Sequence, residues 1–155
     1  MRLRVVALGH RMPGWVDQAY ADYVRRLPRD YAVDLCELKP SPRDRGRTVD
    51  QILELEATRI ETTCDGYRTV VCDERGHSWT TRDLATHLTR WHDQGESIAF
   101  VIGSADGLAP RIRAAATHVV AVSSFTLPHA LVRILVAEQL YRAASLIAGH
   151  PYHRE

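Results

Sequence analysis

The chain has 155 residues, and 20 Lys and Arg stand against 19 Asp and Glu, a formal net charge of +1. A chain of this length can bury about 70% of its unfolded surface, so it needs no disulfide or metal staple. The cysteines are three in number and show no CxxC pairing. Together with an apolar N-terminal run too short for a signal sequence, this favours a reducing cytoplasm over secretion.

Short apolar runs alternate with amphipathic stretches along the chain. Runs rich in β-branched residues predict buried strands, and we place them at residues 2–8, 32–38, 69–73, 97–102 and 118–123. We expect the chain to turn outward at 73–76, after the third of these strands. The alternation predicts an α/β fold over 1–155 as one domain, with a mostly parallel sheet covered by helices on both faces.

Apolar residues at helical spacing predict the helices, which we place at residues 13–27, 48–64, 80–94, 110–116 and 130–148. Thr80 and Asp83 form a capping pair for the third helix. Glu56 is the one acidic residue on the otherwise apolar face of the second. The last helix has apolar residues on more than one stripe, so it is either buried against its sheet and a partner chain or the core helix of a monomer.

Two loops, 103–107 and 123–129, follow strands that we expect to be neighbours. Small ligands bind at the carboxyl ends of strands in open α/β sheets. Gly103-x-x-x-Gly107 is by itself a weak nucleotide signal, because the only lysine is Lys39 and a P-loop lysine is therefore absent. No G-x-S-x-G elbow is present, and no histidine spacing is typical of zinc. We therefore expect no metal.

Basic residues are concentrated in the first third of the chain. Residues 1–47 hold ten Lys and Arg against six Asp and Glu, a balance of +4, whereas 48–155 hold ten against thirteen, a balance of −3. The excess is greatest at 39–47, a loop by its Pro and Gly content. Such a loop either grips phosphate through arginine side chains or is an ordinary solvated loop.

The C-terminal residues combine three chemical groups. Tyr152, His153 and Arg154 supply a stacking ring, an acid/base group and a guanidinium. A chain end with this composition is either frayed or folded over a ligand site.

Longer motifs carry a resemblance to a known family. These motifs include Met12-Pro13-x-Trp15-Val16, Phe100-Val101-Ile102-Gly103-x-x-x-Gly107-Leu108, Thr126-Leu127-Pro128-His129, Glu138-Gln139-Leu140-Tyr141-Arg142-Ala143 and His150-Pro151-Tyr152-His153-Arg154-Glu155. With them the sequence closely resembles the bacterial large-subunit rRNA methyltransferase H family, the pseudouridine N3-methyltransferases of the SPOUT superfamily.

The resemblance implies a SPOUT fold with a C-terminal deep trefoil knot, which periodicity alone could not indicate. It implies S-adenosylmethionine as cofactor and S-adenosylhomocysteine as product. The substrate would be N3 of a pseudouridine in a stem-loop of 23S rRNA at the subunit interface, in the assembled ribosome, and the long helix would form a homodimer. The expected cofactor-binding residues are Cys72, Asp73, Gly103, Ser104, Gly107, Ser123, Ser124, Phe125, Thr126, Leu127 and Pro128.

Methyl transfer to a protonated ring nitrogen needs a general base, and we expect His153 to supply it. Tyr152 would stack on the base, and Arg142 and Arg154 would hold RNA phosphate or carbonyl oxygens. Glu138 lies four residues before Arg142, so the two can pair along the helix. We expect the tail of one protomer to reach the cofactor pocket of the other.

One residue departs from the family loop, which usually has a glycine where this chain has Ser104. A serine there is expected to strain the turn or narrow the pocket, and so to affect cofactor affinity more than the fold. Two alternatives therefore stay open. One is a non-catalytic ribosome- or RNA-binding dimer that has lost the cofactor, and the other is a small-molecule nucleotide-binding enzyme on a flavodoxin-like sheet.

Overall fold

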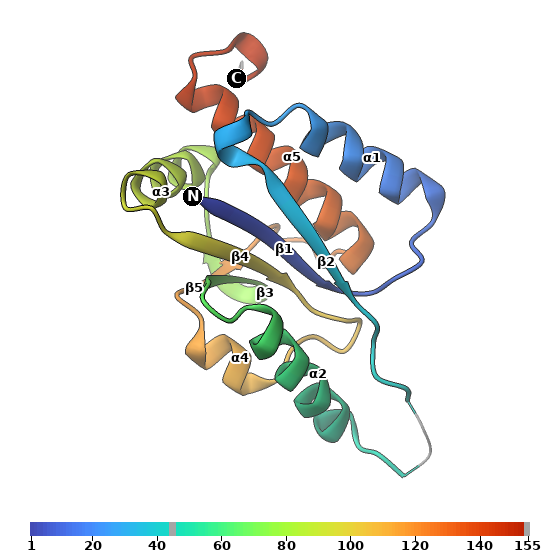
Figure 1. The fold of residues 1–155 in the computed structure, drawn as a ribbon. Coiled ribbons are helices and arrows are strands. Elements are labelled where there is room, and N and C mark those ends of the chain that lie inside the picture. The colour runs from blue at the N-terminus through green and yellow to red at the C-terminus, as the bar shows by residue number, and fades with distance from the viewer. Residues whose placement is uncertain (44–45, 154–155) are drawn as a thin grey trace.

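A five-stranded sheet forms the centre of the molecule in a computed structural model that describes residues 1–43 and 46–153 (Figure 1). Every strand pairing is parallel, and the order across the sheet is β2-β1-β4-β3-β5. The strands are β1 (Arg2–Leu8), β2 (Val33–Leu38), β3 (Arg68–Ser78), β4 (Ser97–Ile102) and β5 (His118–Ala121).

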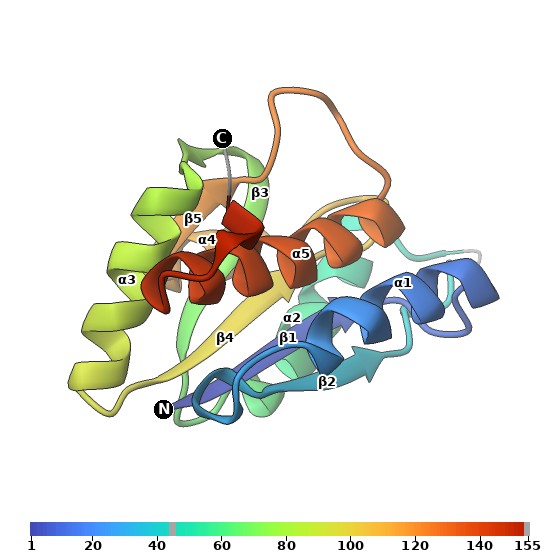
Figure 2. The ribbon, with the colours of Figure 1, turned by 90° about the horizontal axis from the view of Figure 1, so that it is seen from above.

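Helices cover both faces of the sheet, as the alternating pattern predicts. In Figure 2, α1, α3 and α5 lie on one side of the sheet and α2 and α4 on the other. The helices are α1 (Gly14–Arg25), α2 (Val49–Thr63), α3 (Thr81–Asp93), α4 (Pro110–Ala115) and α5 (His129–Ile147), with short 3-10 turns η1 (Arg29–Tyr31) and η2 (Pro151–His153).

The two-residue period of β1 divides the core into two layers. Leu3 and Val5 point into the layer beneath α3 and α5, where Trp91 is fully buried. Val6 and Leu8 point into the opposite layer, against α2 and α4. A central strand that is apolar on both faces therefore positions helices on both sides of the sheet.

Capping side chains begin two of the helices. Thr80 accepts a hydrogen bond from the backbone of Asp83, and the Asp83 carboxylate accepts one from the backbone of Thr80, so the predicted capping pair is confirmed. Thr48 and Gln51 make the same reciprocal pair at the start of α2.

The structure corrects two sequence-based expectations about β3. The predicted outward turn at 73–76 is wrong: β3 runs on to Ser78, with an irregular register between Cys72 and His77. Gly76 permits this, because a Cβ there would lie 2.5 Å from the backbone carbon of Val119 on β5. β3 also lies between β4 and β5, so the two loops do not follow neighbouring strands.

A buried arginine joins the last helix to the first strand–helix connection. Arg133 is 1% exposed, and its guanidinium donates to Glu37 Oε2 at 2.5 Å and to the Gly9 carbonyl at 3.2 Å. A buried charge requires such partners. Helix α5 packs against both α1 and α3 and leaves Leu131 and Ile147 exposed. Among the described residues, no helix has the length and apolar character needed to cross a bilayer.

Candidate functional site

A cleft of about 810 Å³ opens at the carboxyl edge of the sheet. This volume lies in the range of small-molecule sites. The irregular middle part of β3, the loop after β4 and the loop after β5 all contribute to it. The lining of the cleft includes most of the residues expected to bind the cofactor, namely Cys72, Asp73, Gly103, Ser104, Gly107, Ser123, Phe125, Thr126, Leu127 and Pro128. Ser124 is exposed and does not line the cleft.

The first loop is a tight turn against the sheet. Gly107 has φ +86° and donates its backbone N–H to the Ser104 carbonyl at 2.9 Å. A Cβ on Gly103 would lie 2.7 Å from the Gly107 carbonyl oxygen. Glycine is therefore required at 103 for close approach and favoured at 107 for its left-handed backbone.

Ser104 does not adopt the strained backbone that its departure from the family loop suggests. Arg11 is the only non-glycine among the described residues with a positive φ. Ser104 is 9% exposed, and its hydroxyl hydrogen-bonds Glu56 Oε2 at 3.3 Å. The side chain is therefore held on α2, beneath the turn.

The second loop makes fewer contacts. Its own turn is held by the Ser123 hydroxyl, which accepts the backbone N–H of Phe125 at 2.9 Å. Phe125 is 80% exposed. The loop ends where the Pro128 carbonyl accepts the N–H groups of Leu131 and Val132 and so begins α5. One wall of the cleft is thus much less buried than the other.

Titratable residues outside the expected cofactor-binding set also line the cleft. Arg113 donates to the Leu108 carbonyl at 2.9 Å and lies 3.4 Å from Asp73 Oδ2, so it joins the first loop to the middle of β3. Glu74, Arg75 and His129 are further lining residues. Arginine on a short helix carries no sequence signal for this role, because its partners come from distant segments.

Burial tunes two titratable groups in the cleft. It raises the pKa of the Cys72 thiol to about 12, so that side chain is a neutral thiol at physiological pH. Burial, with a smaller contribution from the Arg133 charge, lowers the pKa of His129 below its ordinary value. His129 is therefore neutral at physiological pH and can accept or donate a hydrogen bond.

The tail packs on its own long helix. The Tyr152 hydroxyl lies 3.3 Å from Glu138 Oε1, and its ring centroid is 4.5 Å from that of Tyr141. The Arg142 guanidinium lies 4.9 Å from the Tyr152 ring and donates to Glu138 at 2.8 Å, so the predicted Glu138–Arg142 pair is confirmed. The His153 side chain and Arg154 lie outside the described part of the molecule.

Within one chain, the described part of the tail does not reach the cleft. His129, the first residue of α5, lines the cleft, whereas Tyr152 contacts Glu138 and Arg142 in the second half of the same helix. Glu138 and Arg142 follow His129 by nine and thirteen residues in α5, which corresponds to about 14 and about 20 Å along the helix axis. Figure 1 shows the C-terminal turn at the end of α5 away from the loops that form the cleft.

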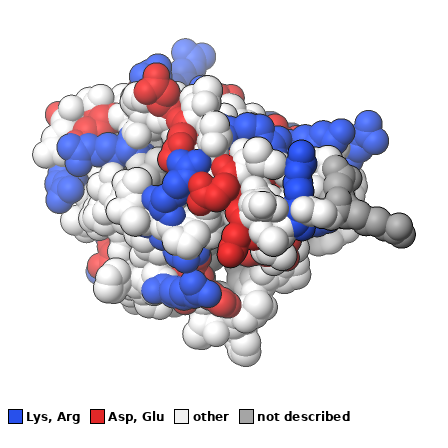
Figure 3. Space-filling model, turned by 90° about the horizontal axis from the view of Figure 1, so that it is seen from below, with Lys and Arg blue, Asp and Glu red and all other residues white. Residues whose placement is uncertain are grey.

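The surface charge is mixed. Figure 3, which views the side of α2 and α4, shows Lys and Arg interspersed with Asp and Glu. Arg111, for example, pairs with both Glu54 and Glu61. Among the described residues, no cluster of His, Cys, Asp and Glu could hold a metal ion.

Comparison with known proteins gives concordant results. A family model described as "Predicted SPOUT methyltransferase" matches residues 1–153. The chain is 51% identical over 155 residues to the ribosomal RNA large subunit methyltransferase H of Nitrosospira multiformis, and 48% identical to that of Burkholderia mallei, covering 99% of both chains in each case.

Solved structures share the fold at lower identity. A probable methyltransferase from Bordetella pertussis aligns with a TM-score of 0.61 at 16% identity, over 92% of this chain and 94% of its own. The Aquifex aeolicus tRNA (m1G37) methyltransferase aligns with a TM-score of 0.53 at 12% identity, over 90% and 69%. These likenesses concern the fold alone.

Proposed function

The chain belongs to the SPOUT methyltransferase family, and from that premise we propose that it methylates N3 of a pseudouridine in 23S rRNA with S-adenosylmethionine. The observation that carries the proposal is the cleft at the carboxyl edge of the sheet, where three separate chain segments bring together the residues expected to hold the cofactor. The named relatives, at about half identity over 99% of the chain, support large-subunit rRNA as the substrate.

The residues present fit the cofactor. Ile102, Leu127 and Val132 give the cleft an apolar lining, and the tight turn at Gly103 and Gly107 leaves backbone close to the cavity. Asp73 and Glu74 supply carboxylates that can receive hydroxyl or ammonium groups. When bound, S-adenosylmethionine supplies an electrophilic methyl group on a sulfonium.

The chain's own residues would then hold the base and remove its proton. In this proposal His153 accepts the N3 proton and Tyr152 stacks on the pseudouridine, an interaction worth about 1–3 kcal/mol. Arg142 and Arg154 hold phosphate or carbonyl oxygens. The bond between Arg142 and Glu138 supports this role, because it fixes the direction of the guanidinium.

We propose a homodimer in which the site is composite. The separation of tail and cleft along α5 supports this, since only a second chain can bring a tail to the cleft without unwinding the helix. Leu131 and Ile147 on α5 and Trp15, 57% exposed on α1, are apolar residues that remain available to such a partner. Burial of apolar side chains of this kind stabilises association.

Four further parts of the proposal follow from the family. Residues 1–155 act as one SPOUT domain, supported by the match over 1–153. The segment after β5 is threaded to form the trefoil knot, for which the support is family membership. The substrate is a stem-loop at the subunit interface of the assembled ribosome. The protein therefore works in the cytoplasm, where ribosomes are found.

The direct test is transfer of labelled methyl from S-adenosylmethionine to ribosomes that lack this modification, with free subunits beside them. We expect label at one pseudouridine of 23S rRNA, and none with a variant lacking residues 152–155. Wild-type dimer that binds S-adenosylmethionine in calorimetry but leaves the rRNA unlabelled would reject the substrate. Wild-type protein that binds ribosomes without binding the cofactor would favour the non-catalytic alternative.

The composite site has its own test. A heterodimer combines one protomer lacking residues 152–155 with one whose cofactor cleft is blocked by Gly103→Trp. It retains one intact tail and one intact cleft, on different chains. We expect about half of wild-type activity from this heterodimer and none from either parent homodimer. An inactive heterodimer would rule out exchange of tails.

A further inference from the structure

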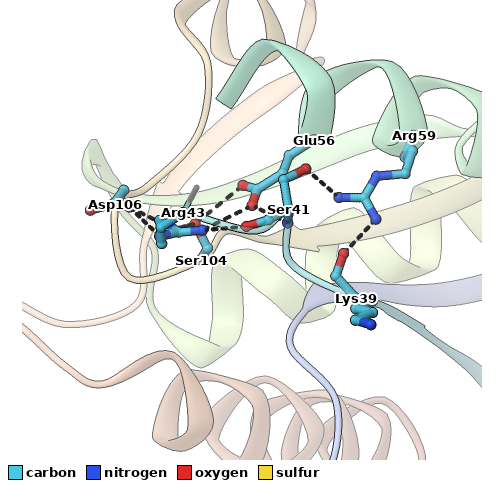
Figure 4. A network of polar contacts seen from close by, with 7 residues as sticks. All are labelled: Lys39, Ser41, Arg43, Glu56, Arg59, Ser104 and Asp106. Atoms are coloured by element: carbon cyan, nitrogen blue, oxygen red, sulfur yellow. Dashed lines mark hydrogen bonds and ion pairs between the residues drawn. The ribbon is translucent and has the colours of Figure 1, made fainter. Parts of the chain in front are cut away.

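A buried carboxylate joins the basic loop to the turn that lines the cleft. Glu56, on α2, is 2% exposed. Its Oε1 accepts the backbone N–H of Ser41 at 3.0 Å and lies 3.5 Å from Arg43 Nη1, while its Oε2 accepts the Ser104 hydroxyl at 3.3 Å (Figure 4). A buried carboxylate is costly unless it is paired in this way. Glu56, the acidic residue on the otherwise apolar face of α2, therefore connects the basic loop to the turn that lines the cleft.

Arg43 completes the network and uses its full donor capacity. Its Nε and Nη2 contact Asp106 Oδ2 at 3.0 and 2.5 Å, and Nη2 also donates to Ser104 Oγ at 3.3 Å. Its Nη1 donates to the Ser41 carbonyl at 3.0 Å and contacts Glu56. Since a guanidinium has five N–H groups, each one here has an acceptor within the protein.

The first residues of the basic loop are fixed by a second arginine. Arg59, one turn along α2 from Glu56, donates to the Lys39 carbonyl and to the Ser41 hydroxyl, the latter at 3.0 Å. Residues 39–43 are thereby held on α2 at both ends, and Arg43 is presented to the cleft turn from a fixed backbone.

We propose that Arg43, Glu56 and Ser104 form a clamp that holds the 103–107 turn in its cofactor-binding shape, so that Arg43 is a positioning residue for the cofactor. Arg43 contacts the turn at both Ser104 and Asp106, which line the cleft, and does not line the cleft itself. This inference rests on the proposed function, because it assigns the cofactor to that turn.

The clamp gives two arginines of the basic loop, Arg43 and Arg47, different roles. Arg47 is exposed and has no hydrogen bond or ion pair to any residue that the structure describes. It is free to contact phosphate, whereas Arg43 would have to break its bonds to Asp106 and Ser104 to do so. The same neutral substitution at these two positions should therefore affect different ligands.

The clamp also reverses the expectation for Ser104. If the serine strained the turn, Ser104→Gly would tighten cofactor binding. In the clamp, glycine loses the bonds to both Glu56 and Arg43 and gains backbone freedom, so cofactor binding should weaken.

Calorimetry with S-adenosylmethionine on the full-length dimer tests the proposal. We expect the Kd to rise about tenfold for Arg43→Gln and about fivefold for Ser104→Gly, from the loss of charged and neutral hydrogen bonds. Arg47→Gln, the matched control, should leave this Kd unchanged and raise the KM for ribosomes. In steady-state kinetics Arg43→Gln should raise the KM for S-adenosylmethionine and leave kcat within about twofold. Tighter binding by Ser104→Gly, or equal effects of Arg43→Gln and Arg47→Gln, would overturn the clamp.

Hydrogen exchange on the cofactor-free protein makes the test independent of the cofactor assignment. Arg43→Gln should speed exchange in peptides covering 104–108, and Arg47→Gln should not. Failure of the wild type to bind S-adenosylmethionine would reject the proposed function while the exchange result still decides whether the clamp exists. Unchanged exchange in Arg43→Gln would reject the clamp even if the wild type binds.

Discussion

Two loops line the same cleft, and they are held in opposite ways. The loop after β4 is fixed from outside itself: Glu56 and Arg43 hold Ser104, and Arg113 holds the Leu108 carbonyl. The loop after β5 is fixed mainly by its own Ser123 turn, and it exposes Phe125 to 80%.

The difference shows that the strand order of a parallel sheet determines where two loops meet, but does not determine how rigid each loop is. The first loop is made rigid by side chains from α2, α4 and the basic loop, which form hydrogen bonds with it. A pre-organised wall lowers the entropic cost of binding a small cofactor, and a freer wall can adapt to a larger partner. On the proposed function, the first loop would hold the cofactor and the second would adjust around cofactor and RNA.

The largest effect is expected from breaking the rigid wall at its tightest contact. Gly103→Ala would place a Cβ within 3 Å of Gly107 backbone and Leu108, so the turn must shift. We expect a loss of about 1–3 kcal/mol in the free energy of unfolding and of measurable S-adenosylmethionine binding. Urea denaturation and calorimetry check this. Ser124→Ala in the other loop is the control, and its free energy of unfolding should stay within about 0.5 kcal/mol of wild type. Similar losses from both variants would show that the two loops do not differ in rigidity.

A smaller effect is expected from removing the tie between the first loop and β3. Arg113→Met keeps most of the side-chain length but loses the bonds to the Leu108 carbonyl and Asp73. We expect the free energy of unfolding to fall by about 1 kcal/mol and the KM for S-adenosylmethionine to rise. A wild-type free energy of unfolding together with a wild-type KM would show that the Arg113 contacts do not stabilise the first loop.

Acidification should act on the end of the second loop, through His129. Burial lowers its pKa in the folded state, so the unfolded chain binds more protons as the pH falls below about 6.5. The stability that neutral His129 contributes is therefore present at pH 7.5 and is lost as the pH falls toward the folded pKa. Burial also lowers the pKa of His87 and His118, which act in the same direction. Urea midpoints at pH 7.5 and 5.5 should differ less in His129→Gln than in wild type, and an equal difference would contradict the assignment.

The smallest effect on stability is expected at the tip of the second loop. Phe125→Ala should leave the free energy of unfolding within about 0.5 kcal/mol, because the ring is already in solvent. We expect it to lower methyl transfer to ribosomes, since an exposed ring beside the cleft is available for a ligand. A marked loss of stability would show that this loop is held more firmly than its contacts indicate.

Local patterns predicted most of the fold. The capping residues Thr80 and Asp83 and the apolar run 97–102 are signals contained within a few residues, and both are confirmed. The extension of β3 could not be found in this way, because Gly76 is explained only by the backbone of Val119 on a later strand.

The candidate site was predicted through family motifs more than through chemistry. Most of the expected cofactor residues line one cleft, because the carboxyl ends of parallel strands share an edge. Only one local feature of the sequence indicated the clamp, namely the acidic Glu56 on an otherwise apolar helix face. Arg43 and Asp106 are 63 residues apart, so no spacing rule joins them. The roles of His153 and Arg154 stay predictions.

Burial of Arg133 has a consequence for how the chain is made. Its bond to the Gly9 carbonyl spans 124 residues, and β1, the first strand to be synthesised, lies at an interior position of the sheet. An interior strand of the sheet is therefore synthesised well before the helix that closes over it. We expect folding to be slow, since contacts of high sequence separation form late.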